Sequence, residues 1–316
     1  MGLFPRNIND FLVLQGIPRG PNSQVFFVDP ASGSNSNPGT NFLAPLASIE
    51  AAYALCVANQ HDVVLYVAGA SGNTLAAAVT WSKSYTHLIG WCAPTMVGQR
   101  SRIFQAAALT GASPLLTVSG SGCIFKNIYI FQGVNDATSL INVAVTGGRN
   151  YFENVHFAGG GHAAQAIDGG ASLQLNGGSE NTFIDCTIGV DTIAAATGMV
   201  GLLVDGSATR NIFKGCNFTM WGGNSGAAFV EFTDITAIDR YLIFKDCNFI
   251  NLGTGQASAF VIPAGFDGTN MRVFLRDCAL FGATDWDASN RGAIQANMGT
   301  FTGGGNSGLF AASASV

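Results

Sequence analysis

The residues whose types could do chemistry are, first of all, a set of aspartates. Enzymes that hydrolyse polysaccharides place two carboxyl groups roughly 5 to 9.5 Å apart, on either side of the glycosidic bond. Three aspartates recur at one position of a sequence repeat, and two more follow in loops near the first: Asp185, Asp246 and Asp277, then Asp191 and Asp205. Because Asn and Asp tolerate a left-handed backbone, we interpret the recurring position as a turn. Asp185, Asp191 and Asp205 remain the one candidate catalytic cluster.

A second candidate is His162, in the segment GGGHAA. The segment resembles the Gly-His-Gly element of polygalacturonase-like hydrolases, but Ala163 replaces the second glycine. The chain has neither the Asp-Asp pair nor the Arg-x-Lys element that would accompany it. We therefore interpret His162 as a loop histidine. A lyase would need an acidic calcium cluster and a basic proton abstractor, and neither is recognisable, so we predict no catalytic residue, metal or cofactor.

Four of the seven cysteines share one column of the repeat: Cys186, Cys216, Cys247 and Cys278. In a parallel, in-register stack their Cβ vectors point the same way, so the Cβ atoms lie farther apart than the ~3.8 Å that a disulfide prefers. A linear stack also cannot surround zinc tetrahedrally, and no C-x-x-C pair is present. We expect reduced thiols that fill the core as small apolar side chains.

The elements that position these residues are internal repeats. The segments CIFKNIYI, YFENVHF, TFIDCTI, IFKGCNF, IFKDCNF and FLRDCAL align without gaps. Their anchor residues are Phe125, Phe152, Phe183, Phe213, Phe244 and Leu275, with successive spacings, by subtraction, of 27, 31, 30, 31 and 31 residues. A fixed period of this length indicates stacked units, one per repeat.

Apolar residues also occupy the positions three and five after each anchor, with mostly polar residues between them. This alternation predicts strands with one buried face. Asn, Asp or Gly two residues after each anchor predicts a sharp corner, at Asn127, Asn154, Asp185, Gly215, Asp246 and Asp277. No repeat has an uninterrupted 12-residue stretch with helical spacing. We predict an all-β fold, a right-handed single-stranded parallel β-helix.

Weaker strand-like runs precede the clear repeats: HDVVLYVAG, HLIGW and RIFQA. Before them, LASIEAAYALCVA predicts a short amphipathic helix with Ser48 as its N-cap and Glu50 at its positive end. We expect this helix to cap the N-terminal end of the solenoid. The domain prediction is an N-terminal attachment arm over 1–24, the β-helix over 25–282 and an uncharged tail or cap over 283–316.

The composition limits the classes of partner that we expect the protein to bind. Only 10% of residues are charged, against roughly 25% in ordinary proteins, so we expect much of the outer surface to be covered in an assembly. A net charge of -5 argues against a nucleic-acid binder, and no apolar run reaches the ~18 residues of a membrane span. The start of the chain does not read as a secretory signal peptide. We expect four cationic side chains to form one outward stripe: Lys126, Lys214, Lys245 and Arg276. Because the aromatic columns point mostly inward, we expect no surface on which sugars could stack.

The opening VFFVDPASGSNSNPGTNFLAPLASIEAAYAL, followed by HDVVLYVAG, resembles pectate-lyase-like β-helix proteins, especially those of bacteriophage virions. The similarity covers about residues 25 to 282. It implies a homotrimer that binds other virion proteins through its N-terminal arm, and we expect the uncharged C-terminal tail to contact neighbouring subunits as well. We therefore expect a non-enzymatic structural protein of the virion, such as a capsid decoration. The alternatives are a tailspike depolymerase and a passive adhesin for host glycans.

Overall fold

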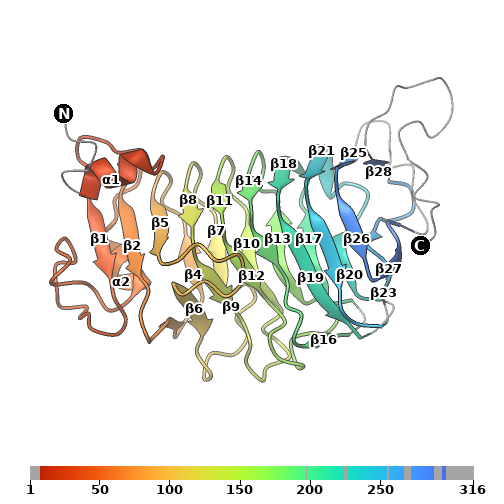
Figure 1. Cartoon of the computed structure of the whole chain (residues 1–316), viewed down its shortest axis with the longest axis horizontal. Helices are drawn as coiled ribbons and strands as arrows, with labels where there is room; N and C mark the ends of the chain where they lie inside the picture. Colours follow the sequence, from red (N-terminus) through yellow and green to blue (C-terminus); the bar gives the residue numbers. More distant parts are fainter. Residues whose placement is uncertain are drawn as a thin grey trace.

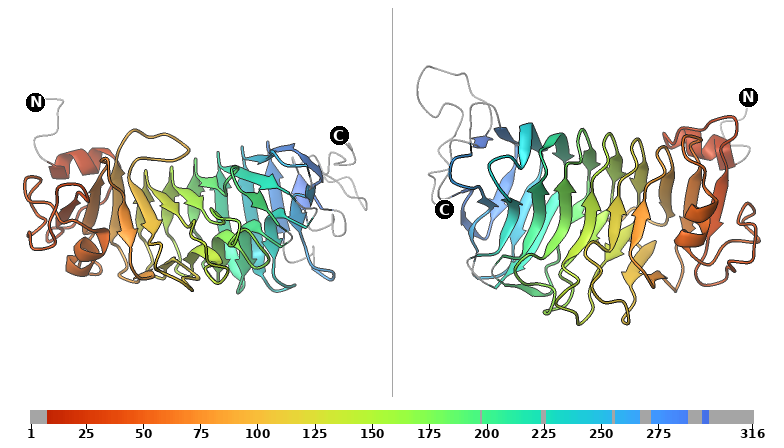
Figure 2. Two further views of the ribbon diagram at one scale, coloured as in Figure 1. Left: turned by 90° about the horizontal axis from the view of Figure 1, so that it is seen from below. Right: turned by 180° about the vertical axis from the view of Figure 1, so that it is seen from behind.

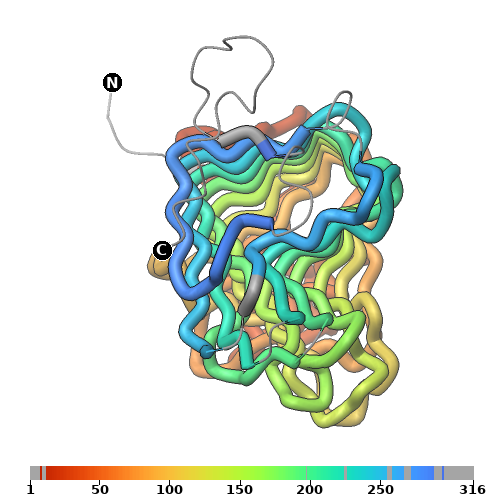
Figure 3. The backbone as a smooth tube through the Cα atoms, turned by 90° about the vertical axis from the view of Figure 1, so that its right-hand side faces the viewer, coloured from red at the N-terminus to blue at the C-terminus, as the bar shows by residue number. Residues whose placement is uncertain are grey.

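The structure is a computed structural model that describes residues 8–196, 198–223, 226–254, 256–266, 272–287 and 294–296. Short strands stack into a straight rod of parallel coils (Figure 1). Seen along the rod, successive coils superpose (Figure 3). Buried apolar side chains fill the space that the coils enclose. This architecture is the right-handed parallel β-helix that the sequence repeats predicted.

Three long parallel sheets form the walls of the rod. Sheet I contains β1 (Val25–Val28), β2 (Val63–Val67), β5 (His87–Trp91), β8 (Ile124–Lys126), β11 (Tyr151–Glu153), β14 (Thr182–Ile184), β18 (Ala208–Lys214), β21 (Ile238–Lys245), β25 (Arg272–Arg276) and β28 (Ile294–Ala296).

Sheet II follows sheet I in each coil. It contains β3 (Asn73–Leu75), β6 (Arg102–Gln105), β9 (Tyr129–Phe131), β12 (His156–Ala158), β15 (Thr187–Ile188), β19 (Asn217–Gly222), β22 (Asn248–Asn251) and β26 (Ala279–Phe281), with β16 (Ala194–Ala195) paired to β19.

Sheet III completes each coil. It contains β4 (Val79–Trp81), β7 (Leu116–Val118), β10 (Ile141–Val145), β13 (Ala171–Asn176), β17 (Val200–Asp205), β20 (Ala228–Phe232) and β24 (Phe260–Val261). A further small sheet pairs β23 (Gln256–Ser258) with β27 (Ala283–Asp285). Strands β27 and β28 continue the stack beyond residue 282, the boundary expected from the sequence.

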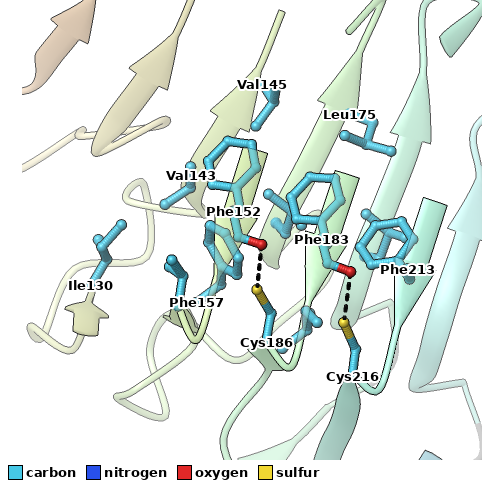
Figure 4. Close-up of a cluster of buried hydrophobic side chains, with 14 of the residues drawn as sticks. Ile130, Val143, Val145, Phe152, Phe157, Leu175, Phe183, Cys186, Phe213 and Cys216 are labelled. Atoms are coloured by element: carbon cyan, nitrogen blue, oxygen red, sulfur yellow. Dashed lines mark hydrogen bonds between the residues drawn. The ribbon is translucent and has the colours of Figure 1, made fainter. Parts of the chain in front are cut away.

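The anchor column is confirmed as one stack inside the rod. Direct strand pairing joins each anchor to the next, from Phe125 through to Leu275. The rings of Phe152, Phe183 and Phe213 stack almost parallel, with centroids 4.7 and 4.4 Å apart (Figure 4). Buried aromatic pairs in this geometry stabilise the core beyond the area that they bury.

The corner and cysteine columns also follow the prediction. All six corner residues have φ between +50 and +65°, which explains why only Asn, Asp and Gly occur there. All seven cysteines are free. The thiols of Cys186 and Cys216 donate to the carbonyl oxygens of Phe152 and Phe183 in the preceding coil, at 3.6 and 3.5 Å (Figure 4). Burial raises the pKa of Cys216 well above its usual value, so this thiol stays protonated.

A ladder of buried asparagines lines a second corner, between sheets III and I. The side-chain oxygens of Asn150, Asn181 and Asn211 accept the backbone N–H of the preceding coil's equivalent residue, at 2.8 to 2.9 Å. Their side-chain nitrogens donate to the carbonyl oxygens of Gly120, Gly147 and Gly178. Each amide therefore satisfies two buried backbone groups where the chain turns.

Two helices lie at the N-terminal end of the rod (Figure 2). The predicted cap is α2 (Ile49–Leu55), in which the Ser48 hydroxyl accepts the N–H of Ala51 and Ile49 and Ala52 join the core. Helix α1 (Ile8–Leu14) lies within the predicted arm and was not expected. Its Leu12, together with Ile17, packs on the outer face of sheet I against Leu65 and Ile89. Most of the uncharged segment from 292 to 316 lies outside the described residues.

Candidate functional site

The candidate aspartates of the sequence lie at separate places. Asp185 is at the corner between sheets I and II. Asp205 ends β17 at the far edge of sheet I, where it accepts a hydrogen bond from the Thr233 hydroxyl at 2.8 Å. The strand β18 separates the two corners by seven residues, or about 20 Å. Asp191 lies in the loop after β15. The structure does not bring the three together because the coil places its corners on different sides of the rod.

His162 belongs to a loop between sheets II and III. Its Nδ1 accepts the N–H of Ala164 at 3.1 Å, and its carbonyl oxygen accepts the N–H groups of Gln165 and Ala166. These contacts form a local turn, which agrees with the interpretation of His162 as a loop histidine.

A carboxylate pair that the sequence did not indicate lies on the outer face of sheet III. Glu231, on β20, is half-buried beside Leu203, which packs on a small apolar cluster. Burial, and then the negative charge of Asp168, raise the pKa of Glu231. A carboxyl group with a raised pKa is the kind of group that general acid catalysis uses. No local pattern reveals it, because Asp168 comes from a loop two coils earlier.

Residues 92–99 form a strap that leaves β5 and runs along the rod across sheet II (Figure 1). The N–H of Gly98 donates to Nδ1 of His156 at 3.2 Å, and the carbonyl oxygen of Met96 accepts the Thr187 hydroxyl at 2.8 Å. Gln99 is buried and donates to the backbone oxygen of Asn154 at 2.9 Å. These contacts fix the strap to the corners of several later coils.

A groove of about 400 Å³ lies between the strap and the loop that follows β15; we call it the strap groove. The strap contributes Val97, and the opposite wall contributes Asp191 and Thr192. Gly189 lies on its floor at φ +104°, where a Cβ atom would meet the carbonyl oxygen of Thr219 at 2.1 Å. The groove therefore depends on a glycine at this position.

His156 holds the two walls of the strap groove. Because its Nδ1 accepts the N–H of Gly98, its proton is on Nε2, which donates to the carbonyl oxygen of Gly189 at 2.9 Å. Burial lowers the pKa of His156 to about 4. The ring is neutral near pH 7 and both its nitrogens are occupied, so it positions the walls and is not available as a base.

Aromatic side chains do face outward at one end of the strap groove. Phe104, Tyr129 and Phe131 lie on the outer face of sheet II and make edge and stacked contacts, with centroids 5.7 to 6.2 Å apart. The sequence predicted that aromatic residues lie mostly in inward columns and form no sugar-stacking platform, and these three outward rings depart from that pattern. These three rings occupy outward positions of strands whose inward residues are Ile103 and Ile130.

Exposed apolar side chains concentrate at the other end of the molecule. Of 14 large apolar side chains that are exposed among the described residues, eight lie between residues 13 and 91. Leu43 and Leu14 are 87 and 68% exposed. Beside them lies a groove of about 270 Å³ lined by Leu12, Ile17 and Trp91. We call this region the N-terminal apolar surface.

The predicted cation stripe is also in place, with Lys126 paired to Glu153 at 2.7 Å.

Within the described residues no group of three or more His, Cys, Asp or Glu side chains is arranged to hold a metal ion. None of the helices in that part of the chain has the length and apolar character needed to cross a bilayer.

Comparison with known proteins identifies the fold and no family. No protein-family profile and no curated protein sequence matches the chain. A pectate lyase Pel9A is 16% identical with a TM-score of 0.57, over 86% of this chain and 72% of that one. A rhamnogalacturonan lyase is 16% identical with a TM-score of 0.56, over 82% of this chain and 69% of that one. A pectin methylesterase in complex with a hexasaccharide is 16% identical, TM-score 0.56, over 89 and 91%. These likenesses show the fold of the chain, a parallel β-helix.

Proposed function

We propose that this chain is a non-enzymatic structural rod of a bacteriophage particle, a homotrimer fixed to the capsid or tail by its N-terminal end. The observation that carries the proposal is the N-terminal apolar surface. Soluble proteins rarely expose apolar side chains in such a concentration unless a partner covers them. The low charge of the whole chain supports the same conclusion, because a rod with few charged residues depends on assembly to stay dispersed.

The other residues that could do chemistry have structural roles in this reading. The corner aspartates hold left-handed turns, His156 joins the strap to a wall, and the buried cysteines fill the core. The names of the structural neighbours indicate activity on carbohydrates. At 16% identity, however, these neighbours support the fold alone.

Substitution at the N-terminal end tests the proposal. We expect Leu14→Glu combined with Leu43→Glu to leave the fold unchanged, since both side chains are exposed, and to reduce the copies of the protein per purified particle at least tenfold. Quantitative mass spectrometry of particles measures this number. Phe281→Glu, 64% exposed at the opposite end, is the matched control and should be incorporated normally. Equal incorporation of the double variant and the control would refute attachment by this surface.

Polysaccharide cleavage is a second candidate, favoured by the raised pKa of Glu231 beside Asp168. Under the structural proposal, the purified chain releases no reducing ends or unsaturated products from capsular or pectic polysaccharides. Cleavage that is lost in Glu231→Gln and kept in Glu180→Gln, a variant in the turn before β14, would establish an enzyme and overturn the first proposal.

A further inference from the structure

We infer that the strap groove is a binding site for an extended, uncharged oligosaccharide that carries N-acetyl groups. The inference goes beyond the structural role, because a particle-bound rod needs no such groove. It rests on four properties of the groove: its period, its hydrogen-bonding groups, its apolar borders and its charge.

The period of the groove matches an extended sugar chain. The groove runs along the rod from Tyr129 and Phe131 on β9 to Ile250 and Leu252 near β22. These residues belong to five successive coils of sheet II, so the floor is about 19 Å long at ~4.8 Å per coil. The coil spacing is close to the rise per residue of an extended polysaccharide. Equivalent side chains of successive coils can therefore meet successive sugars, about four in number.

Hydrogen-bonding groups line the floor and one wall. The side-chain nitrogen of Asn217 donates to the Met96 sulfur, a weak acceptor, at 3.7 Å, while its side-chain oxygen accepts from Asn248 at 3.0 Å. The Asp191 carboxylate makes no hydrogen bond within the described part of the chain. Thr192 is exposed and Thr219 half-buried. Amide, hydroxyl and carboxylate groups in this arrangement suit the hydroxyl and amide groups of a sugar, which both donate and accept.

Apolar side chains border these polar groups. Val97 on the strap and Leu252 beyond β22 are 60 and 53% exposed, and Val190 also lines the groove. The rings of Tyr129 and Phe131 close the N-terminal end of the groove. A pyranose ring has an apolar face that packs on such rings, and the methyl of an N-acetyl group can pack on Val97, Val190 or Leu252.

The charge of the groove selects the sugar. Its lining holds the carboxylate of Asp191 and a neutral His156, and no lysine or arginine. An anionic sugar such as galacturonate would meet a like charge in a partly desolvated site, which weakens binding. The site therefore differs in preference from the pectin-directed proteins that share the fold.

Binding to the full-length protein tests the inference by isothermal titration. The N-acetylglucosamine hexamer is the probe, with the glucose and galacturonate hexamers as comparisons. We expect the N-acetylglucosamine hexamer to bind most tightly and the galacturonate hexamer least. Asn217→Ala combined with Leu252→Ser should weaken binding about tenfold or more, since each removes a contact with the sugar.

The matched control is Asp239→Asn combined with Val261→Ser, at exposed positions outside the groove, which should bind as the wild type does. Thermal unfolding shows that both double variants are folded. Absence of binding by the N-acetylglucosamine hexamer overturns the inference. So does equal or tighter binding of the galacturonate hexamer, or equal affinity of the groove variant and the control. None of these outcomes affects particle attachment, which is measured separately.

Discussion

At the scale of single residues, the chain uses polar side chains mainly to fix its own backbone. His156 is the clearest case: it is almost fully buried, neutral, and bonded on both ring nitrogens to the two walls of the strap groove. A histidine in this state makes stability depend on pH, because the unfolded chain binds a proton more readily than the native chain does.

His156 should therefore make the protein less stable in acid. Its pKa is about 4 in the native state against 6.5 in an unfolded chain. The contribution of His156 to the free energy of unfolding is complete above pH 6.5. It is lost as the pH falls toward 4, and the loss is roughly 3 kcal/mol at pH 4. Thermal unfolding between pH 7 and 4 measures the effect.

The matched variant is His156→Gln, which keeps polar atoms but does not titrate. It should be less stable at pH 7 and lose less stability between pH 6.5 and 4 than the wild type. His87, whose buried ring has its pKa lowered to about 3, acts in the same direction and remains in both proteins. An unchanged pH slope in the variant would show that His156 does not carry the effect.

Residue-scale prediction from the sequence succeeded where a position recurs. Asp185 and Asp246 were interpreted as corner residues, and their φ values of 50 and 55° agree. The pair of Asp168 and Glu231 could not be found in this way. The two residues come from a loop and a strand of different coils, and only the completed rod brings their charges together.

At the scale of elements, the asparagine ladder stabilises the corner that leads into sheet I. Its members Asn150, Asn181 and Asn211 occur two residues before their anchors, so a fourth recurrent column was present in the sequence and was missed. The strap could not be predicted, because residues 92–99 have no periodicity and their partners lie as far as 121 residues away.

Asn181→Ala tests the ladder. The change leaves the N–H of Asn150 and the carbonyl oxygen of Gly147 buried without these partners, so we expect a loss of roughly 2 to 5 kcal/mol in the free energy of unfolding. Denaturant titration measures this loss. Asn248→Ala, at an exposed position of sheet II, is the control and should cost less than about 0.5 kcal/mol. Similar losses in both variants would mean that burial of the ladder amides contributes little.

At the scale of the whole molecule, the rod has two unlike ends. The N-terminal end has helices, a groove and most of the exposed apolar side chains, whereas the regular coils of the middle bury theirs in one continuous core. This polarity suits a protein that is fixed at one end and projects from it. Length and repeat period predicted the rod, but the surface of its first coils depends on helix α1, which shows no repeat.

The trimer remains a prediction that mass measurement checks. We expect light scattering on the purified protein to give three times the chain mass of 32.7 kDa, independent of concentration in the micromolar range. Leu14→Glu with Leu43→Glu should keep this mass if the N-terminal apolar surface faces the particle and not the other subunits. A monomeric wild type would exclude the trimer.

The strap also constrains how the chain can mature on the ribosome. Coils of a solenoid can in general add one after another as they emerge, since each contacts only its neighbours. Met96, however, needs Thr187 and Asn217, which are synthesised about a hundred residues later. The strap can therefore begin to dock when Asn154 and His156 have been made, but its contacts are completed only with Asn217, when more than two thirds of the chain has been translated.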